Sequence, residues 1–239
     1  MRLLKTIPLL GLLLSLTAHA EPASVNNVKV YSEYEYDTYF KGTLLERWCE
    51  PLSASDPDAS SATYAIVFDS IREFSAAYPK ELLNKYLRGV FLLSNLNCSG
   101  KPYGGTYAEK SIYLNVYDYT AKSWLDKALH HEFSSVLVNA TRFSFYTFAG
   151  ISGYSNYNPS IEKDCLATAK NCRIIRDDLL EKGFLNDYGR TSYENDFNVY
   201  AEALFTDHSH LRYLAREYPI INKKYQVIKK FYNDLGVKI

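Results

Sequence analysis

The stretch ALHHEFSSVLV, residues 128–138, lies inside a longer run that has the spacing of an amphipathic helix. At about 100° per residue, a helix from 121 to 139 gathers its apolar residues on one face. That face contains Leu125, Ala128, Leu129 and Val136. Glu132 falls in the middle of it, and a carboxylate in apolar surroundings is costly unless it is paired, hydrogen-bonded or bound to a metal. The stretch therefore predicts a packed helix in which Glu132 needs a partner.

Two interpretations of Glu132 follow from this position. Its carboxylate can bond to a backbone amide or a tyrosine hydroxyl, as part of a structural network. It can act instead as a general base beside a metal ligand. His131 and Trp124 flank the same face, whereas His130 points about 100° away from His131 and is expected at the surface.

The segments before this helix have the pattern of a sheet. GVFLLSNL, residues 89–96, is an apolar run typical of a buried strand, and SIYLNVYDY, residues 111–119, alternates as a strand does. The glycine-rich SGKPYGGTY, residues 99–107, is expected as the turn between them. We therefore expect an α+β fold with a small mixed sheet and a strand directly before the helix of Glu132.

The C-terminal half is expected to be mainly helical. A long helix is predicted from 193 to 218, and another follows Pro219, from 223 to 235. Glu194, Asn198 and Glu202 are spaced by four in the first of these helices and share one polar stripe. The stripe is either the solvated edge of an amphipathic helix or a set of side chains directed at the helix of Glu132.

The order of these elements resembles the minimal core of the zincin-like metallopeptidases. The likeness runs over roughly residues 80–206 and consists of the strand SIYLNVY, the helix ALHHEFSSVLV and the later helix ENDFNVYAEALF. The turn GGTY before the strand adds to it, and YAEALF is similar to the FAEAF of lethal-factor-like peptidases. The resemblance implies a zincin-like fold in which the strand lines a substrate cleft and the two helices carry a zinc site.

The first of these helices matches the family motif in part. The resemblance implies that His131 is the first zinc histidine and that Glu132 is the catalytic general base. The pattern H-E-x-x-H requires a second histidine four residues after His131, where this chain has Ser135. A serine hydroxyl is a poor ligand for zinc.

The later helix departs from the family as well. Asn198 stands where the resemblance places the third ligand, a glutamate, and Glu202 matches a second acidic residue one turn further on. Either Glu194 or Glu202 could replace the missing ligand after a shift of one turn. The candidate metal ligands are therefore His131, Glu194 and Glu202, while His208 is either a further ligand or a packed histidine of the core.

Ligand number decides what the resemblance implies for activity. Catalytic zinc needs three protein ligands and an open position for water. With one ligand matched outright, we expect an exported zincin-like metallopeptidase with weak or lost activity, with zinc as its candidate cofactor and a peptide or protein as its candidate substrate. The alternative is a non-catalytic envelope protein that binds a peptide or glycan in the cleft. A third hypothesis is a structural or interaction protein whose helix matches by chance.

The first twenty residues have the pattern of a secretory signal peptide. Arg2 and Lys5 precede the apolar run 7–16, and Ala18 and Ala20 match a cleavage site. The apolar run is shorter than a membrane-spanning helix. We therefore expect export to the periplasm or beyond the cell.

The rest of the chain is expected to form two parts. Residues 21–62 are expected to be an N-terminal extension and linker, and residues 63–239 the zincin-like domain. Removing Arg2 and Lys5 leaves 25 basic and 27 acidic residues, a net charge of −2. Neither the basic patch that nucleic acid requires nor a membrane span is expected.

Four cysteines in an exported chain predict two disulfides. They are Cys49, Cys98, Cys165 and Cys172. Of three pairings, we expect Cys165–Cys172, which closes the short loop CLATAKNC, and Cys49–Cys98, which ties the N-terminal part to the centre. A zinc site of cysteines is disfavoured because no C-x-x-C spacing occurs.

Overall fold

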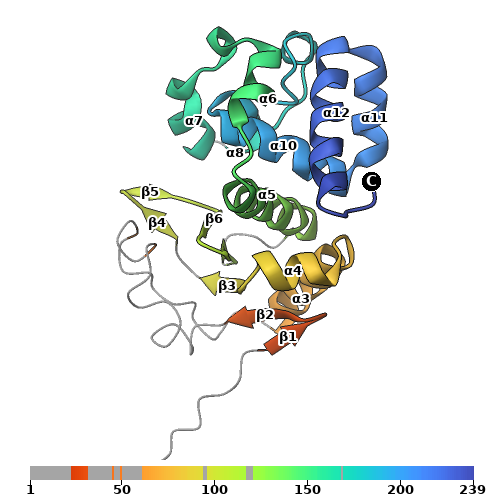
Figure 1. Ribbon diagram of the computed structural model, residues 1–239. Coiled ribbons are helices and arrows are strands. Elements are labelled where there is room, and N and C mark those ends of the chain that lie inside the picture. Colours follow the sequence, from red (N-terminus) through yellow and green to blue (C-terminus); the bar gives the residue numbers. More distant parts are fainter. Residues whose placement is uncertain are drawn as a thin grey trace, which may run out of the picture.

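The computed structural model describes residues 23–31, 45, 49, 61–93, 96–116, 121–167 and 169–239. Within these ranges the fold is α+β, with a small mixed sheet and a helical C-terminal half, as the sequence predicted (Figure 1). The predicted signal peptide, residues 1–20, lies outside the described residues.

The main sheet has five strands in the order β1-β2-β3-β7-β6. Their bounds are Ala23–Val25 for β1, Val28–Tyr31 for β2, Gly89–Leu93 for β3, Ser111–Asn115 for β7 and Gly105–Ala108 for β6. β3 pairs in parallel with both β2 and β7, whereas the outer pairs β1–β2 and β6–β7 are antiparallel. A two-stranded sheet, β4 (Asn97–Cys98) with β5 (Lys101–Pro102), precedes β6.

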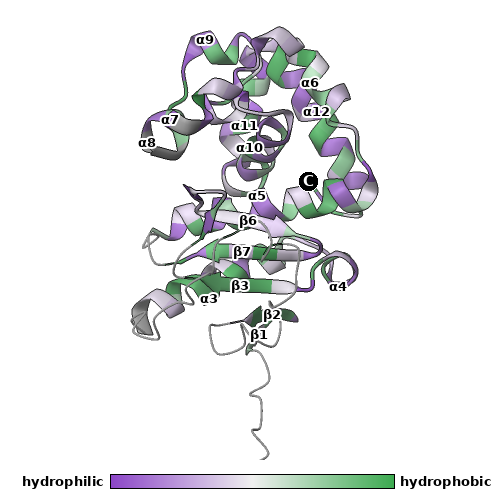
Figure 2. Cartoon of the chain, turned by 90° about the vertical axis from the view of Figure 1, so that its left-hand side faces the viewer, coloured by the Kyte–Doolittle hydropathy of each residue, from purple (hydrophilic) through white to green (hydrophobic). Residues whose placement is uncertain are grey.

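Alternation along β3 and β7 gives the sheet two buried faces. Val90, Leu92, Ile112 and Leu114 pack into the main core under the helices. Phe91 and Tyr113 point to the other face, where they stack at 4.8 Å and pack with Leu45 and Cys49. The middle of each strand is apolar (Figure 2), whereas β7 has the polar residues Ser111 and Asn115 at its two ends. A strand buried on both faces requires this continuous run of apolar residues.

The N-terminal residues belong to this sheet. β1 and β2 fall within residues 21–62, the segment expected to be an extension, and β2 pairs with β3. The predicted turn 99–107 also differs from the structure, because it contains β5 and part of β6. Residues 105–108 form β6, which pairs with β7. This pairing outweighs the preference of glycine for turns.

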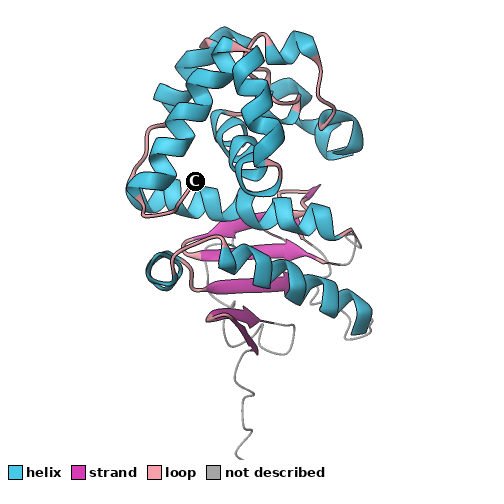
Figure 3. Cartoon of the chain, turned by 90° about the vertical axis from the view of Figure 1, so that its right-hand side faces the viewer, coloured by secondary structure: helices cyan, strands magenta, loops and turns pink. Residues whose placement is uncertain are grey.

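Helices cover the sheet and then extend away from it (Figure 3). The described α-helices are α3 (Ser61–Ala76), α4 (Lys80–Tyr86), α5 (Lys122–Thr141), α6 (Phe145–Ser152), α7 (Glu162–Ala167), α8 (Ala169–Cys172), α9 (Asp177–Leu180), α10 (Tyr193–Thr206), α11 (His208–Glu217) and α12 (Pro219–Asp234). α5 packs on α3 and β6 on one side and on α10 on the other. Every residue from Ala128 to Val138 is consequently buried.

The long helix predicted from 193 to 218 is two helices. α10 ends at Thr206, and the next residue, Asp207, has a φ of −150° that is not helical and a carboxylate that accepts a bond from the His210 amide. Aspartate is a preferred N-cap because it satisfies a free amide of the next helix. Helical periodicity continues across Asp207, but its N-cap role separates the two helices. α12 begins at Pro219 rather than 223, since proline suits the first turn of a helix.

Both predicted disulfides form. Cys49 bonds to Cys98 and Cys165 bonds to Cys172, and no cysteine is free. In the described part of the chain, no helix combines the length and the apolar character needed to cross a membrane.

Candidate functional site

A cavity of about 240 Å³ lies where the N-terminal half of α5 meets the two glycines at the start of β6, Gly104 and Gly105. Its wall is formed by thirteen residues, namely Pro102, Tyr103, Gly104, Gly105, Asn115, Trp124, Ala128, His131, Glu132, Cys165, Cys172, Arg173 and Tyr188. Glu132 and His131 thus lie in a concave site together with a basic side chain and aromatic rings. Sites for small ligands commonly have this mixture of apolar wall and few polar groups.

Glu132 is the buried carboxylate of this cavity. A methyl group added to Gly105 would lie 3.1 Å from its Oε1 atom, so the absence of a side chain there leaves room for the carboxylate against β6. Burial raises the pKa of Glu132 to about 7, with Glu194 and Glu202 adding to the rise and His131 and Arg173 opposing it. A carboxyl group with such a pKa can both take up and release a proton near neutral pH.

His131 and Glu202 form the first contact between α5 and α10 at this site. His131 Nδ1 lies 2.7 Å from Glu202 Oε1, and Arg173 Nη1 donates to Glu202 Oε2. Burial opposes ionisation of Glu202, but Arg173 and His131 outweigh it and lower the pKa of that carboxyl. Burial likewise opposes the charge on His131, but the bond to Glu202 and the nearby carboxylates raise its pKa. The three side chains form one continuous ionic network.

Ser135 and Asn198 form a second contact, one helical turn away on each helix. Asn198 Nδ2 donates to Ser135 Oγ at 2.7 Å, and Ser135 Oγ donates to Glu194 Oε1 at 2.6 Å. The pairs His131–Glu202 and Ser135–Asn198 show that α5 and α10 run antiparallel here, with matching turns in contact. The polar stripe of α10 therefore faces α5, not solvent.

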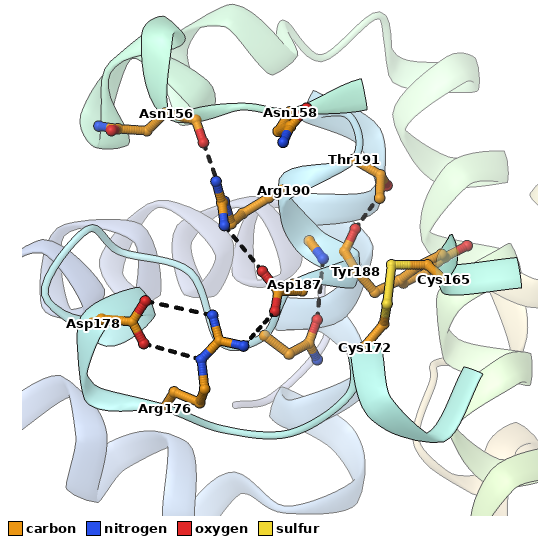
Figure 4. A network of polar contacts seen from close by, with 12 residues as sticks. Asn156, Asn158, Cys165, Cys172, Arg176, Asp178, Asp187, Tyr188, Arg190 and Thr191 are labelled. Atoms are coloured by element: carbon orange, nitrogen blue, oxygen red, sulfur yellow. Dashed lines mark hydrogen bonds and ion pairs between the residues drawn. A yellow bond between two sulfur atoms is a disulfide. The ribbon is translucent and has the colours of Figure 1, made fainter. Parts of the chain in front are cut away.

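The remaining wall comes from the segment between α6 and α10. The Cys165–Cys172 disulfide lines the cavity beside Tyr188, whose ring lies 5.0 Å from the Arg173 guanidinium carbon. Asp187 bonds to Arg176 at 2.7 Å and to Arg190 at 3.0 Å, which fixes the turn that carries Tyr188 (Figure 4). This wall is thus held in place by the Cys165–Cys172 disulfide and by the bonds of Asp187 to Arg176 and Arg190.

Two histidines considered from the sequence, His130 and His208, lie elsewhere. His130 was expected at the surface, and that prediction is wrong: it is buried, with Nδ1 2.8 Å from the Tyr78 hydroxyl and its ring stacked on Phe205. Burial lowers its pKa to about 3, so it is a neutral member of the core. His208 bonds to the Tyr225 hydroxyl at 2.9 Å and is a packed residue.

The donor atoms do not suit a zinc ion. Throughout the described ranges, no group of three or more His, Cys, Asp or Glu residues is arranged to hold a metal. Both Glu202 oxygens already bind protein donors, and Glu194 accepts from Ser135. Asn198 Oδ1 is a buried acceptor with no partner among the described groups, but a neutral amide oxygen is a ligand for harder cations than zinc.

Several residues of the site could not be found from the sequence. Arg173 and Tyr188 reach it from a segment with no recognisable motif, and Asn115 is the last residue of a strand. The adjacency of Arg173 to Cys172 is the only local signal that it has a fixed position. The pairing of Arg173 with Glu202 joins residues 29 apart in the chain.

Comparison with known proteins adds little to this site. No protein-family model matches the chain, and no curated protein matches it. Among solved structures, the fold is similar to a Bacteroides caccae protein provisionally described as a zinc-binding metallo-peptidase. The two chains are 18% identical, with a TM-score of 0.47, and the match covers 72% of this chain and 69% of the other.

Proposed function

We propose that this chain is an exported protein with a zincin-like cleft that binds a peptide without cleaving it. One observation carries the proposal. The two positions where the motif requires a histidine and a glutamate hold Ser135 and Asn198, and their side chains bond to each other. A hydroxyl and an amide cannot replace two strong zinc donors, so the water-activating centre of a zinc peptidase is missing.

The candidate ligand roles of His131, Glu194 and Glu202 bear on the same point. All three lie on the facing sides of α5 and α10, but each is engaged by a protein partner. Glu132 keeps the position of a general base, but without a bound metal to lower the pKa of a water molecule, the nucleophile of the zinc-peptidase mechanism does not form. We therefore propose that peptidase activity is absent.

A peptide is the ligand that the cleft supports best. β6 is an outer strand in the order of the described sheet, and its first residue, Gly105, lines the cavity together with the preceding Gly104. An extended peptide can add to such a strand through main-chain hydrogen bonds, while its side chains enter neighbouring pockets. Glycines keep this approach free of side chains.

A glycan is the second candidate ligand, because three aromatic side chains line the cavity. Tyr103, Trp124 and Tyr188 line the cavity together with the polar side chains of Asn115 and Glu132. Amphipathic rings offer a flat apolar surface beside hydrogen-bonding groups. The two disulfides support export in either case, since such bonds persist in oxidising compartments.

The test combines zinc content, hydrolysis and binding. The mature protein, prepared without chelator and dialysed against zinc, should hold no stoichiometric metal and should not cleave a fluorogenic peptide library. Peptides that bind should change the fluorescence of Trp124, and a Trp124→Phe variant should lose that change. Oligosaccharides in place of peptides decide between the two ligand classes. Zinc-dependent hydrolysis that a chelator removes would overturn the proposal.

A further inference from the structure

The cleft concentrates negative charge that needs compensation. Glu132 and Glu202 are buried, and Glu194 is half-buried. The negative charges of Glu194 and Glu202 both raise the pKa of Glu132. Buried carboxylates of like sign raise the free energy of the folded protein unless a cation is close. In a zinc peptidase the metal is that cation. Here the residues do not fit zinc, so the compensating charge must come from protein side chains. His131, which contacts Glu202, supplies part of it when it is protonated, and a permanent charge needs another group.

Arg173 is placed to supply this charge. Its Nη1 lies 2.5 Å from Glu202 Oε2, and its guanidinium packs over the ring of Tyr188. The side chain is 27% exposed, against 5% for Glu202, so the charge sits at the border between cavity and core. Arg173 lines both the main cavity and a second cavity of about 100 Å³, whose wall includes Glu202.

The chain fixes Arg173 before any ligand arrives. It directly follows Cys172, whose disulfide with Cys165 closes the preceding loop. A guanidinium is charged at every physiological pH and presents a rigid fork of donors. A cation held in this way is always present, whereas a metal depends on supply.

We propose that Arg173 is the resident cation of this cleft and occupies the electrostatic place of the metal. This inference deepens the proposed function and rests on it. It has a specific consequence: restoring the two missing ligands is not sufficient for zinc binding, because the guanidinium repels a second cation from the same carboxylates.

The experiment compares three proteins by zinc titration and elemental analysis. They are the unmodified protein, Ser135→His/Asn198→Glu, and the same double variant with Arg173→Met. We expect about one equivalent of zinc only in the triple variant, with an affinity at least about tenfold above that of the double variant. Arg173→Lys in the double variant is the matched control, since it keeps the charge and should keep zinc out.

The outcomes separate the two proposals. Equal zinc affinity in the double and triple variants would overturn the role of Arg173 and leave the proposed function standing. One equivalent of zinc in the unmodified protein would overturn the proposed function itself. If neither variant binds zinc while circular dichroism shows both folded, the positions do not form a decayed zinc site and the inference fails.

A chemical rescue gives a readout that does not require new ligands. Arg173→Ala should be less stable than the unmodified protein, and millimolar methylguanidinium should raise its Tm in a saturable way. Arg72→Ala, which removes an exposed ion pair with Asp69 on α3, is the control and should not respond. The absence of rescue in a folded Arg173→Ala protein would contradict the inference.

Discussion

Two ion pairs join a basic side chain to a carboxylate of α10, and they differ in every respect that matters for function. Lys224 and Asp196 are 0% and 1% exposed, and both come from long helices. Arg173 and Glu202 are 27% and 5% exposed, and the arginine directly follows Cys172, which ends a loop closed by a disulfide. The first pair is sealed in the core, whereas the second lies between two cavities.

The surroundings of the two pairs explain their roles. The Lys224 ammonium lies within 6 Å of the rings of Phe148, Phe184, Tyr157 and Tyr200, and Tyr157 donates to Asp196. Nothing there is open to a ligand, so this pair holds α12 on α10. At Glu202, the same helix instead meets His131 and a cavity. Burial of charge alone does not point to a functional site, and the adjoining cavities are the reason that we propose one at Glu202.

The largest effect should come from breaking the sealed pair. Lys224→Met leaves the Asp196 carboxylate buried without its cation, which should lower the free energy of unfolding by about 3–5 kcal/mol. Arg173→Met should cost less, because its partner lies next to a cavity that water can enter. Urea denaturation of both variants measures the difference. If both variants lost the same free energy of unfolding, the proposed difference between the pairs Lys224–Asp196 and Arg173–Glu202 would be contradicted.

A second prediction concerns Glu132 and pH. Its pKa is raised from 4.5 to about 7 by burial, so the folded protein binds a proton there that the unfolded chain has released. The unmodified protein should therefore lose stability relative to Glu132→Gln as pH rises from about 4.5 to 7, by up to about 3 kcal/mol. Above pH 7 the difference should be constant. Denaturation curves between pH 4 and 8 test this, and a pH-independent difference would argue against a buried, neutral Glu132.

A smaller effect is expected from the disulfide loop that directly precedes Arg173. Cys165→Ser/Cys172→Ser opens a short loop and should cost about 2–3 kcal/mol, the chain entropy of so short a closure. The change should also reach the cleft and alter Trp124 fluorescence, because Arg173 loses its anchor. Cys49→Ser/Cys98→Ser is the control, since that disulfide lies on the other face of the sheet. The same Trp124 change in both variants would mean that the loop has no special link to the site.

The sequence predicted the parts of the molecule that depend on local pattern. The helix of Glu132, a strand beginning at 111 and both disulfides follow from periodicity, spacing and compartment, and the structure contains all of them. The strand was predicted over 111–119 and is described as β7 over Ser111–Asn115. The resemblance implied that α5 and α10 lie side by side with their polar side chains in contact. Two hydrogen-bonded pairs, His131–Glu202 and Ser135–Asn198, join the helices in this way.

The features that the sequence missed depend on distant partners. His130 is buried because Tyr78, 52 residues away, and Phe205 enclose it. The break at Asp207 is a capping choice that helical periodicity does not reveal. Arg173 has no motif, and its importance appears only when Glu202 is placed beside it. Side chains that meet across the fold leave no trace in local spacing.

The most direct test of the central claim is a crystal of the unmodified protein soaked in zinc and measured on both sides of the zinc absorption edge. We expect no anomalous peak beside His131, with the Arg173 guanidinium seated on Glu202. A zinc peak within bonding distance of His131 Nε2, with Arg173 displaced from Glu202, would contradict the claim that Arg173 takes the place of the metal.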